Sequence, residues 1–284
     1  MLDPEIRVLD EREVETMLDW AADEGWNPGL HDGAAFRATD PHGFLGLFVD
    51  GELVVTASIV RYDTTFAFFG CYICRADRRG QGFGLALAQT ALARADATTI
   101  GLDGVLEQEH TYERVGFVTA HRNIRFGGEP NLGAVEPGRA RRLRTEDLAA
   151  LERYERASAA FPAPRPAFLR HWISAPGTAG YAVGPPGRVD GYGVIRPCRS
   201  GHKIGPLFCD SRADAECLVD ALVRSVDPGT GPVFLDVPAP HDRAVSLAED
   251  LGLSPVFETA RMYRGPEPAL DLDHVFGITT FELG

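Results

Sequence analysis

Lysine is nearly absent from this 284-residue chain, and long apolar runs are absent altogether. Lys203 is the only lysine, and the acidic residues outnumber the basic ones to give a formal net charge of −13. No basic stripe of the kind that binds nucleic acid is visible, so we expect no nucleic-acid partner. No stretch reaches the roughly 18 apolar residues of a membrane span, and the N-terminus lacks the apolar core of an export signal. We therefore expect a cytoplasmic protein that makes no membrane contact.

Cysteine is scarce, and its pattern argues against a disulfide framework. The five cysteines are odd in number and widely scattered, which is typical of a reducing compartment. Cys71 and Cys74 form a C-x-x-C pair, but a zinc knuckle needs a second pair of ligands and none occurs at suitable spacing. Both cysteines also fall in an apolar run that reads as a buried strand. We predict core cysteines and no metal.

The chain length and an internal repeat both predict two domains. A chain of 284 residues exceeds the usual size of a single domain. Residues 6–14 and 140–148 each combine an arginine with a following helix, and residues 112–117 and 248–253 each end a helix at a glycine before a strand. Elements follow in the same order in both halves, with a glycine- and proline-rich linker near residues 127–138. The alternative is that two unrelated α/β units look alike at this level of detail.

A glycine loop in the first half carries the clearest chemistry. Residues 79–84 read Arg-Gly-Gln-Gly-Phe-Gly, follow an apolar strand and open an alanine-rich helix. Closely spaced glycines let backbone N–H groups turn toward an anion, and the helix N-terminus adds unpaired donors and a partial positive charge. With Arg78 and Arg79, this predicts a pyrophosphate cradle. A Walker loop would need Lys-Ser/Thr after Gly84, and a dinucleotide fingerprint would need wider spacing. The structural alternative is a simple tight turn.

These residues resemble the R/Q-x-x-G-x-G/A motif of the GNAT superfamily of acetyltransferases. Residues 71–78 are similar to the strand and exit that precede the motif, and residues 112–117 resemble the Y-E-x-x-G-F segment that follows it. Residues 20–30 and 276–284 are similar to a bacterial subgroup of tandem GNAT proteins. The resemblance implies a mixed α/β (α+β) fold of two tandem domains, each a twisted mixed sheet flanked by helices.

On this basis we assign a catalytic GNAT domain to residues 1–130 and a degenerate GNAT-like domain to residues 138–284. The second half has Ser-Arg-Ala-Asp-Ala-Glu at 211–216, where the first half has its glycine loop. Asp214 and Glu216 would repel a pyrophosphate, so we expect this half not to hold CoA. Packing on the first half and walling the acceptor pocket are the expected tasks.

The resemblance implies direct attack of an amine on the thioester of acetyl-CoA, which is a co-substrate. The predicted partners are therefore acetyl-CoA and a small, cationic primary amine; a homodimer remains possible. The alternatives are an acyl-CoA sensor without turnover and an interaction scaffold. The predicted contacts with CoA are Ile73, Cys74, Arg78, Arg79, Gly80, Gln81, Gly82, Phe83 and Gly84.

Two catalytic roles follow from the same resemblance. Tyr112 matches the family position that donates a proton to the CoA sulfur, although a tyrosine before a helix-ending glycine could simply pack in the core. Asp103 is the leading candidate for the base because it ends an apolar strand that points into the cleft. A turn-forming aspartate is nearly as plausible there, and Glu107 and His110 are further candidates.

The acceptor site is predicted in the irregular segment after the first helix. Trp26, Asn27 and Asp32 fall in this segment, which lines the substrate cleft in the implied fold. Aromatic and carboxylate groups together suit a cationic amine. Trp26 could equally anchor the segment to the core.

Overall fold

The computed structural model of the protein describes residues 4–133, 139–185 and 187–284. The elements of the first half are β1 (Pro4–Val8), α1 (Glu11–Asp23), α2 (Asp32–Thr39), β2 (Phe44–Val49), β3 (Glu52–Arg61), β4 (Phe66–Cys74), α3 (Phe83–Arg94), β5 (Thr99–Val105), α4 (Glu109–Glu113) and β6 (Val118–Gly128). The elements of the second half are β7 (Arg141–Arg142), α5 (Leu148–Ser158), α6 (Pro166–Trp172), β8 (Ala179–Val183), β9 (Gly191–Pro197), β10 (His202–Cys209), α7 (Arg212–Arg224), β11 (Val233–Pro238), α8 (Asp242–Asp250), β12 (Ser254–Arg264) and β13 (Val275–Gly277). Short 3₁₀ turns occupy Ala76–Arg78, Leu106–Gln108, Thr145–Asp147 and Leu272–His274.

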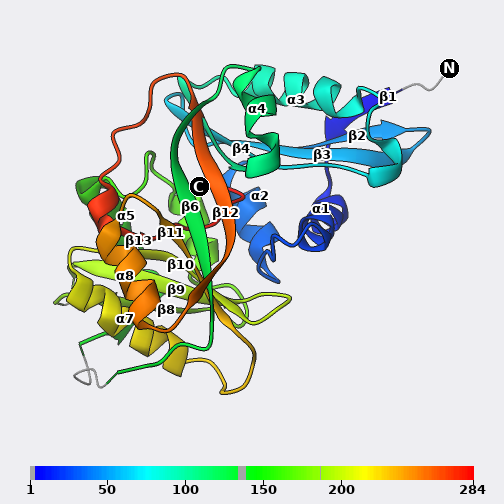
Figure 1. Cartoon of the computed structure of the whole chain (residues 1–284). Coiled ribbons are helices and arrows are strands. Elements are labelled where there is room, and N and C mark those ends of the chain that lie inside the picture. The colour runs from blue at the N-terminus through cyan, green and yellow to red at the C-terminus, as the bar shows by residue number, and fades with distance from the viewer. Residues whose placement is uncertain (1–3, 134–138, 186) are drawn as a thin grey trace.

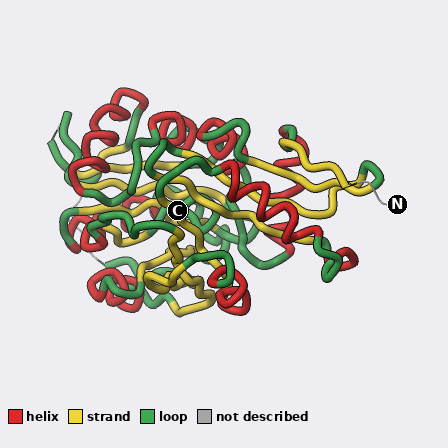
Figure 2. The backbone as a smooth tube through the Cα atoms, turned by 90° about the horizontal axis from the view of Figure 1, so that it is seen from above, coloured by secondary structure: helices red, strands yellow, loops and turns green. Residues whose placement is uncertain are grey.

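The strands of both halves join in one continuous sheet with helices on either side (Figure 2). The strand order is β1-β2-β3-β4-β5-β12-β6-β11-β10-β9-β8-β7, and β13 pairs with β10 beside this path. Helix α3 packs on β2, β3 and β4, and α7 packs on β8, β9 and β10 in the second half. The repeat seen in the sequence is therefore present as two mixed α/β units, which confirms the predicted fold class. Within the described residues, no helix is long and apolar enough to cross a membrane.

The two halves exchange their last long strands. Strand β12 of the second half lies between β5 and β6 of the first, and β6 continues the sheet by pairing with β11 of the second half. Figure 1 shows β6 and β12 running side by side between the two units. All these pairings are antiparallel. Each half therefore contributes a strand to the sheet of the other half. The assigned domains, residues 1–130 and 138–284, follow each other in the sequence but share strands in the structure.

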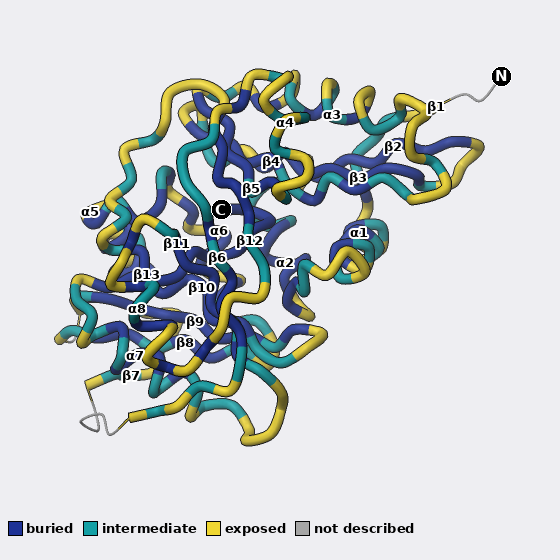
Figure 3. Tube along the Cα trace, in the orientation of Figure 1, coloured by how far each residue is buried: buried dark blue, intermediate teal, exposed yellow. Residues whose placement is uncertain are grey.

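The apolar core is shared across the same seam. One cluster of buried side chains contains residues of both halves, and the Phe36 ring of α2 stacks on the Trp172 indole of α6 with 6.3 Å between ring centroids. Figure 3 shows buried chain running through both units and along the strands between them. Burial of these large side chains stabilises the contact between the halves as it does the interior of one domain.

Buried ion pairs add directional contacts to this apolar seam. Arg125 on β6 donates two hydrogen bonds to the Asp236 carboxylate on β11, at 2.6 and 2.8 Å, and both side chains are almost fully buried. Arg196 on β9 pairs with Asp32 at the start of α2, at 3.0 Å. Each pair joins the two halves. Removing one partner of such a pair leaves an unbalanced charge in a region that water does not reach.

The Arg125–Asp236 pair gives a test of the exchanged seam. In Asp236→Asn the Arg125 guanidinium loses its counter-charge, and we expect the free energy of unfolding to fall by about 3–5 kcal/mol. The matched control is Asp273→Asn, because Asp273 pairs with Arg243 at 3.5 Å while its side chain is 76% exposed. That change should cost at most about 1 kcal/mol. Urea unfolding of both variants measures the difference, and equal losses would contradict the proposed role of the pair.

Candidate active site

A cavity that contains the predicted CoA loop lies where β4 and β5 separate. These parallel strands pair only from Phe66 to Phe68 and from Thr99 to Gly101, and they diverge beyond this point. This cavity, of about 530 Å³, occupies the gap. Its walls are β4, the glycine loop, the start of α3, the end of β5 and Tyr112 from the first half. The second half contributes Phe257, Thr259, Phe281 and Glu282.

A bulge in β4 shapes one wall of this cavity. The register between β3 and β4 shifts between Thr56 and Ser58, opposite the segment from Gly70 to Ile73. Cys71 takes a positive φ of 46°, and its carbonyl accepts a hydrogen bond from the Thr56 hydroxyl at 3.0 Å. A bulge re-aims the side chains and backbone groups that follow it. Ile73 and Cys74, both predicted as CoA contacts, accordingly line the cavity together with Cys71.

The glycine loop faces open space at the mouth of the cavity. Gly80 and Gly82 have φ values of +77° and +84°, and a Cβ at either position would meet no atom within 4 Å. Gly82 is the N-cap of α3, so the helix begins directly behind the loop. Gly84 is required for another reason, because a Cβ there would lie 2.5 Å from the Tyr72 hydroxyl oxygen. These positions suit glycine for backbone conformation and close approach respectively.

The backbone N–H groups of this loop are available to a ligand. Among the described residues, none of the N–H groups of residues 79–84 has an acceptor in the protein, and the first paired donor of the helix is Ala86, which bonds to the Gly82 carbonyl. Unpaired N–H groups at a helix N-terminus form an anion site, which the helix dipole strengthens. No acidic residue lies in the first turn of α3 to compete for them. The loop therefore fits a pyrophosphate.

The two arginines beside the loop line the cavity and are already held in place. Arg79 donates to the Cys74 carbonyl at 2.9 Å and pairs with Glu24 at 2.6 Å. Arg78 lies 3.8 Å from Glu52. Of the nine predicted CoA contacts, all but Gln81 line the cavity. The exposed Gln81 side chain instead donates to the Asp77 carbonyl at 3.4 Å.

Tyr112 lies in the cavity wall, between the loop and the end of β5. Its ring packs edge-on against Phe117, with centroids 6.3 Å apart, and it occupies the space that a Cβ at Gly104 would need. Burial raises the pKa of Tyr112, so its hydroxyl keeps its proton. Tyr72, a second tyrosine that sequence reasoning did not single out, lines the same cavity. The predicted role of Tyr112 as proton donor remains a prediction.

Asp103 lines the cavity, but its carboxylate is engaged by the second half. Arg261 of β12 donates to both oxygens, at 2.9 and 2.7 Å, and the Asn123 amide of β6 donates at 2.8 Å. The side chain is fully buried. Burial raises the pKa of the Asp103 carboxyl, while the Arg261 guanidinium opposes this shift. Three donors on one carboxylate favour an anchor between β5, β12 and β6, and the role of base stays a prediction.

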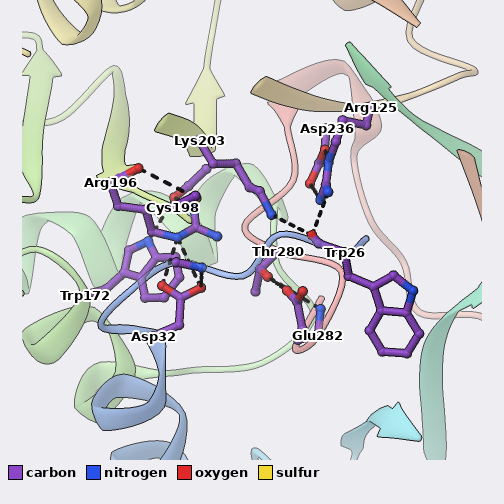
Figure 4. Close-up of polar contacts among 12 residues, drawn as sticks. Trp26, Asp32, Arg125, Trp172, Arg196, Cys198, Lys203, Asp236, Thr280 and Glu282 are labelled. Atoms are coloured by element: carbon purple, nitrogen blue, oxygen red, sulfur yellow. Dashed lines mark hydrogen bonds and ion pairs between the residues drawn. The ribbon is translucent and has the colours of Figure 1, made fainter. Parts of the chain in front are cut away.

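The three predicted acceptor contacts separate in the structure. Trp26 lines the cavity, and its backbone carbonyl accepts hydrogen bonds from Arg125 at 2.7 Å and Lys203 at 3.4 Å (Figure 4). Asn27 and Asp32 do not line this cavity, and their role as acceptor contacts stays a prediction. The Asp32 carboxylate is taken up by Arg196 and by the Gly29 N–H at 2.8 Å.

Asn27 is used in a similar way, as a bridge between the halves. Its amide donates to the Ser200 carbonyl at 2.9 Å and accepts from the Ser200 N–H at 3.1 Å. Of the three predicted acceptor contacts in the segment after α1, Trp26 lines the cavity. The other polar groups of this segment hold the second half against the first.

The second half supplies walls that sequence reasoning named only in general terms. Phe257 and Thr259 belong to β12, and Phe281 and Glu282 belong to the C-terminal segment. Residues 276–284 resemble a tandem GNAT subgroup, but that resemblance did not predict that they would line the cavity. The repeat pattern assigns β12 to the second unit. It does not predict that β12 pairs with strands of the first unit.

Where the second half would carry a phosphate loop, it caps its helix instead. The Ser211 hydroxyl is the N-cap of α7 and accepts from the Asp214 N–H at 3.2 Å. The Asp214 side chain pairs with Arg139, and Glu216 pairs with Arg212 at 2.8 Å. The donors at this helix start are thus partly satisfied by the protein, and carboxylates surround them.

Comparisons with known proteins agree with this arrangement. Residues 7–117 match the acetyltransferase (GNAT) family, and residues 154–277 match an acetyltransferase (GNAT) domain. The chain is 30% identical over 272 residues to a holothin acyltransferase of Pseudoalteromonas sp. (strain SANK 73390). The aligned region covers 96% of this chain and 92% of that protein.

Two solved structures share the fold over nearly the whole chain. A putative acetyltransferase from Pyrococcus horikoshii has a TM-score of 0.81 at 22% identity, covering 99% of this chain and 96% of that one. A tandem GNAT protein from the clavulanic acid biosynthesis pathway has a TM-score of 0.64 at 15% identity, covering 93% of this chain and 100% of that one.

The fold, the cavity and these matches define an acyl-CoA-dependent N-acyltransferase with two related domains. The chain belongs to the GNAT family of acetyltransferases, as the glycine loop and the Tyr112–Phe117 segment predicted. An acyl-CoA and an amine acceptor are the substrates that this family implies.

The loop can be tested by adding a charge where the cavity is open. In Gly82→Glu a carboxylate would face the pyrophosphate; two like charges about 4 Å apart repel by about 4 kcal/mol near a protein surface, or roughly 1,000-fold in affinity. Calorimetry with CoA measures the loss. Gly229→Glu is the matched control, because Gly229 also has a φ of +79° and open space around it. CoA binding that survives Gly82→Glu would contradict the cradle.

Proposed function

We propose that this protein transfers an acetyl group from acetyl-CoA to the primary amine of a small, cationic acceptor. The observation that carries the proposal is the cavity between β4 and β5, which has free loop N–H groups at one end and buried carboxylates at the other. A ligand that spans it would place its phosphates at the loop and its thioester beside the β4 bulge.

The acceptor end of the cavity supports a cationic amine. Trp26 offers an aromatic face and Glu282 a carboxylate, a combination that attracts ammonium groups. The guanidinium of Arg261 is already paired with Asp103 and does not offset the charge of Glu282. The holothin acyltransferase acts, by its name, on holothin, and we infer that this chain modifies a small molecule of comparable kind.

The close packing behind β4 supports a short acyl group. A Cβ at Gly70 would lie 2.3 Å from the Glu282 carbonyl oxygen, so the C-terminal segment lies directly against the strand beside which the thioester would rest. An acetyl group needs little room there, whereas a long chain would have to displace this segment.

The proposed reaction is direct transfer without an acyl-enzyme. The amine nitrogen attacks the thioester carbon, the carbon–sulfur bond breaks, and the departing thiolate takes a proton from the Tyr112 hydroxyl. Holding both substrates in one cavity supplies the orientation that such a reaction needs. The second half, whose α7 start is capped and lined with carboxylates, takes no CoA in this proposal and serves as a wall.

The role of Tyr112 is tested by removing its hydroxyl. In Tyr112→Phe we expect kcat to fall about 100-fold, because proton transfer to the thiolate contributes about 10²–10⁴ in rate. CoA affinity should stay within about twofold, because the loop is unchanged. Thiol release from acetyl-CoA with an amine panel measures kcat, and calorimetry measures affinity.

Tyr72→Phe is the matched comparison, since it removes the other tyrosine hydroxyl of the cavity. A larger loss of kcat in Tyr72→Phe than in Tyr112→Phe would indicate that Tyr72, and not Tyr112, is the proton donor. An unchanged kcat in Tyr112→Phe would remove its catalytic role. CoA binding by wild type without thiol release for any amine would favour a sensor.

A further inference from the structure

The C-terminal segment passes between the two halves and ends against the catalytic one. After β13, the Thr279 carbonyl oxygen would lie 2.4 Å from a Cβ at Gly205, and the Glu282 carbonyl oxygen would lie 2.3 Å from a Cβ at Gly70. The Tyr62 hydroxyl donates to the Leu283 carbonyl at 2.9 Å, and the Gly284 N–H donates to the Thr280 carbonyl at 3.0 Å. The backbone of this segment is thus held by β4, β10 and its own turn.

Glu282 is the one ionisable residue that this segment adds to the cavity wall. Its side chain is 2% exposed, and one carboxylate oxygen, Oε2, accepts a hydrogen bond from the Thr280 hydroxyl. The other oxygen, Oε1, has no hydrogen-bond partner among the described residues. Leaving a buried carboxylate oxygen without a donor costs free energy, so a donor group that reaches Oε1 from the cavity would be bound there.

The two buried carboxylates of the cavity differ in what their oxygens already contact. Both oxygens of Asp103 accept from the Arg261 guanidinium, which keeps its proton at any ordinary pH. Glu282 has a free lone pair and no direct cation partner within ion-pair distance among the described residues. A group that takes a proton from a substrate must first touch it, and of these two buried carboxylates only Glu282 has an oxygen without a hydrogen bond. Glu107, another base candidate that lines the cavity, is exposed.

Two of the cations around Glu282 belong to ion pairs, whereas the Lys203 ammonium has no carboxylate within ion-pair distance among the described residues (Figure 4). Arg125 is paired with Asp236 and Arg196 with Asp32, and Lys203 donates to the Trp26 carbonyl at 3.4 Å. Cys71 is a further ionisable neighbour, and burial raises the pKa of its thiol. Burial also raises the pKa of Glu282, and the Lys203 ammonium opposes that shift. A carboxyl with a raised pKa is a better match to an amine than an exposed one.

From this geometry we propose that Glu282 is the catalytic base: its Oε1 binds the acceptor ammonium and takes its proton. The proposal rests on the amine-acylating function proposed above. The second half then supplies the base for a reaction whose acyl donor is held by the first half.

The protons balance in this scheme. The acceptor ammonium gives one proton to Glu282 and attacks the thioester as a neutral amine. When the carbon–sulfur bond breaks, Tyr112 gives its proton to the thiolate. The nitrogen loses its second proton as the amide forms, and this proton restores Tyr112. Glu282 releases its proton to solvent after the products leave.

The decisive variant is Glu282→Gln, which keeps the shape of the side chain but cannot take the proton. At neutral pH and saturating substrates we expect kcat to fall about 100-fold. As the pH rises toward the pKa of the free amine, the rate of the variant should climb about tenfold per pH unit, because solvent then removes the proton. The wild type should level off, and the CoA affinity of the two should agree within about twofold.

The experiment uses acetyl-CoA with a panel of small primary amines that includes putrescine, histamine and tyramine. Glu267→Gln, an exposed position after β12, is the matched control and should behave as wild type. An active wild type together with a Glu282→Gln variant of unchanged kcat and pH profile would overturn the proposal alone. A wild type that acylates no amine would overturn the proposed function, and this inference with it.

A second variant covers the case in which Glu282→Gln does not fold. Thr280→Val removes the hydroxyl that stabilises the ionised carboxylate, which raises the pKa of Glu282. The acidic limb of kcat against pH should move to higher pH while CoA affinity is kept. An acidic limb that does not move would contradict Glu282 as the base, and Asp103→Asn would then be compared for the same shift.

Discussion

The antiparallel pairing of β12 with β5 and β6 is the contact on which the rest of this structure depends. It inserts a strand of one half into the sheet of the other, so neither sheet is complete without its partner. The same insertion brings Arg261 onto Asp103 and carries Phe257 and Thr259 to the cavity. The same strands therefore form both the cavity wall and the contact between the halves. A substitution that weakens this contact also changes the cavity.

The two halves contribute different chemical groups to the cavity. The first half has a helix start with free N–H groups, because positive-φ glycines turn the loop outward. The second half has closed its own helix start with Ser211 and surrounded it with carboxylates. The second half contributes apolar and acidic side chains to the cavity wall, namely Phe257, Phe281 and Glu282.

The sequence predicted best those features that depend on neighbouring residues. The glycine loop, the strand before it and the two-unit plan follow from local backbone requirements, and the family matches confirm the two-unit plan. The sequence could not indicate the partners of Asn27 and Asp32, because Ser200 and Arg196 lie more than 160 residues away in the chain. No residue near Asp32 in the sequence indicates that its carboxylate is paired with an arginine. From the sequence alone, a buried carboxylate in an ion pair cannot be distinguished from one that binds a substrate.

The same limit explains why Glu282 was not found. An exchange of equivalent strands leaves the local sequence pattern intact, since β6 and β12 are each 11 residues long and each follows the last helix of its own unit. What changes is the set of neighbours, and with it the environment of any carboxylate brought to the seam. Asp103 was favoured as base because the strand before it points into the cleft, yet the exchange gives its two oxygens a permanent cation. The exchange gives Glu282 no such cation, and a carboxylate that is buried, unpaired and next to the cavity is what proton transfer from an ammonium requires.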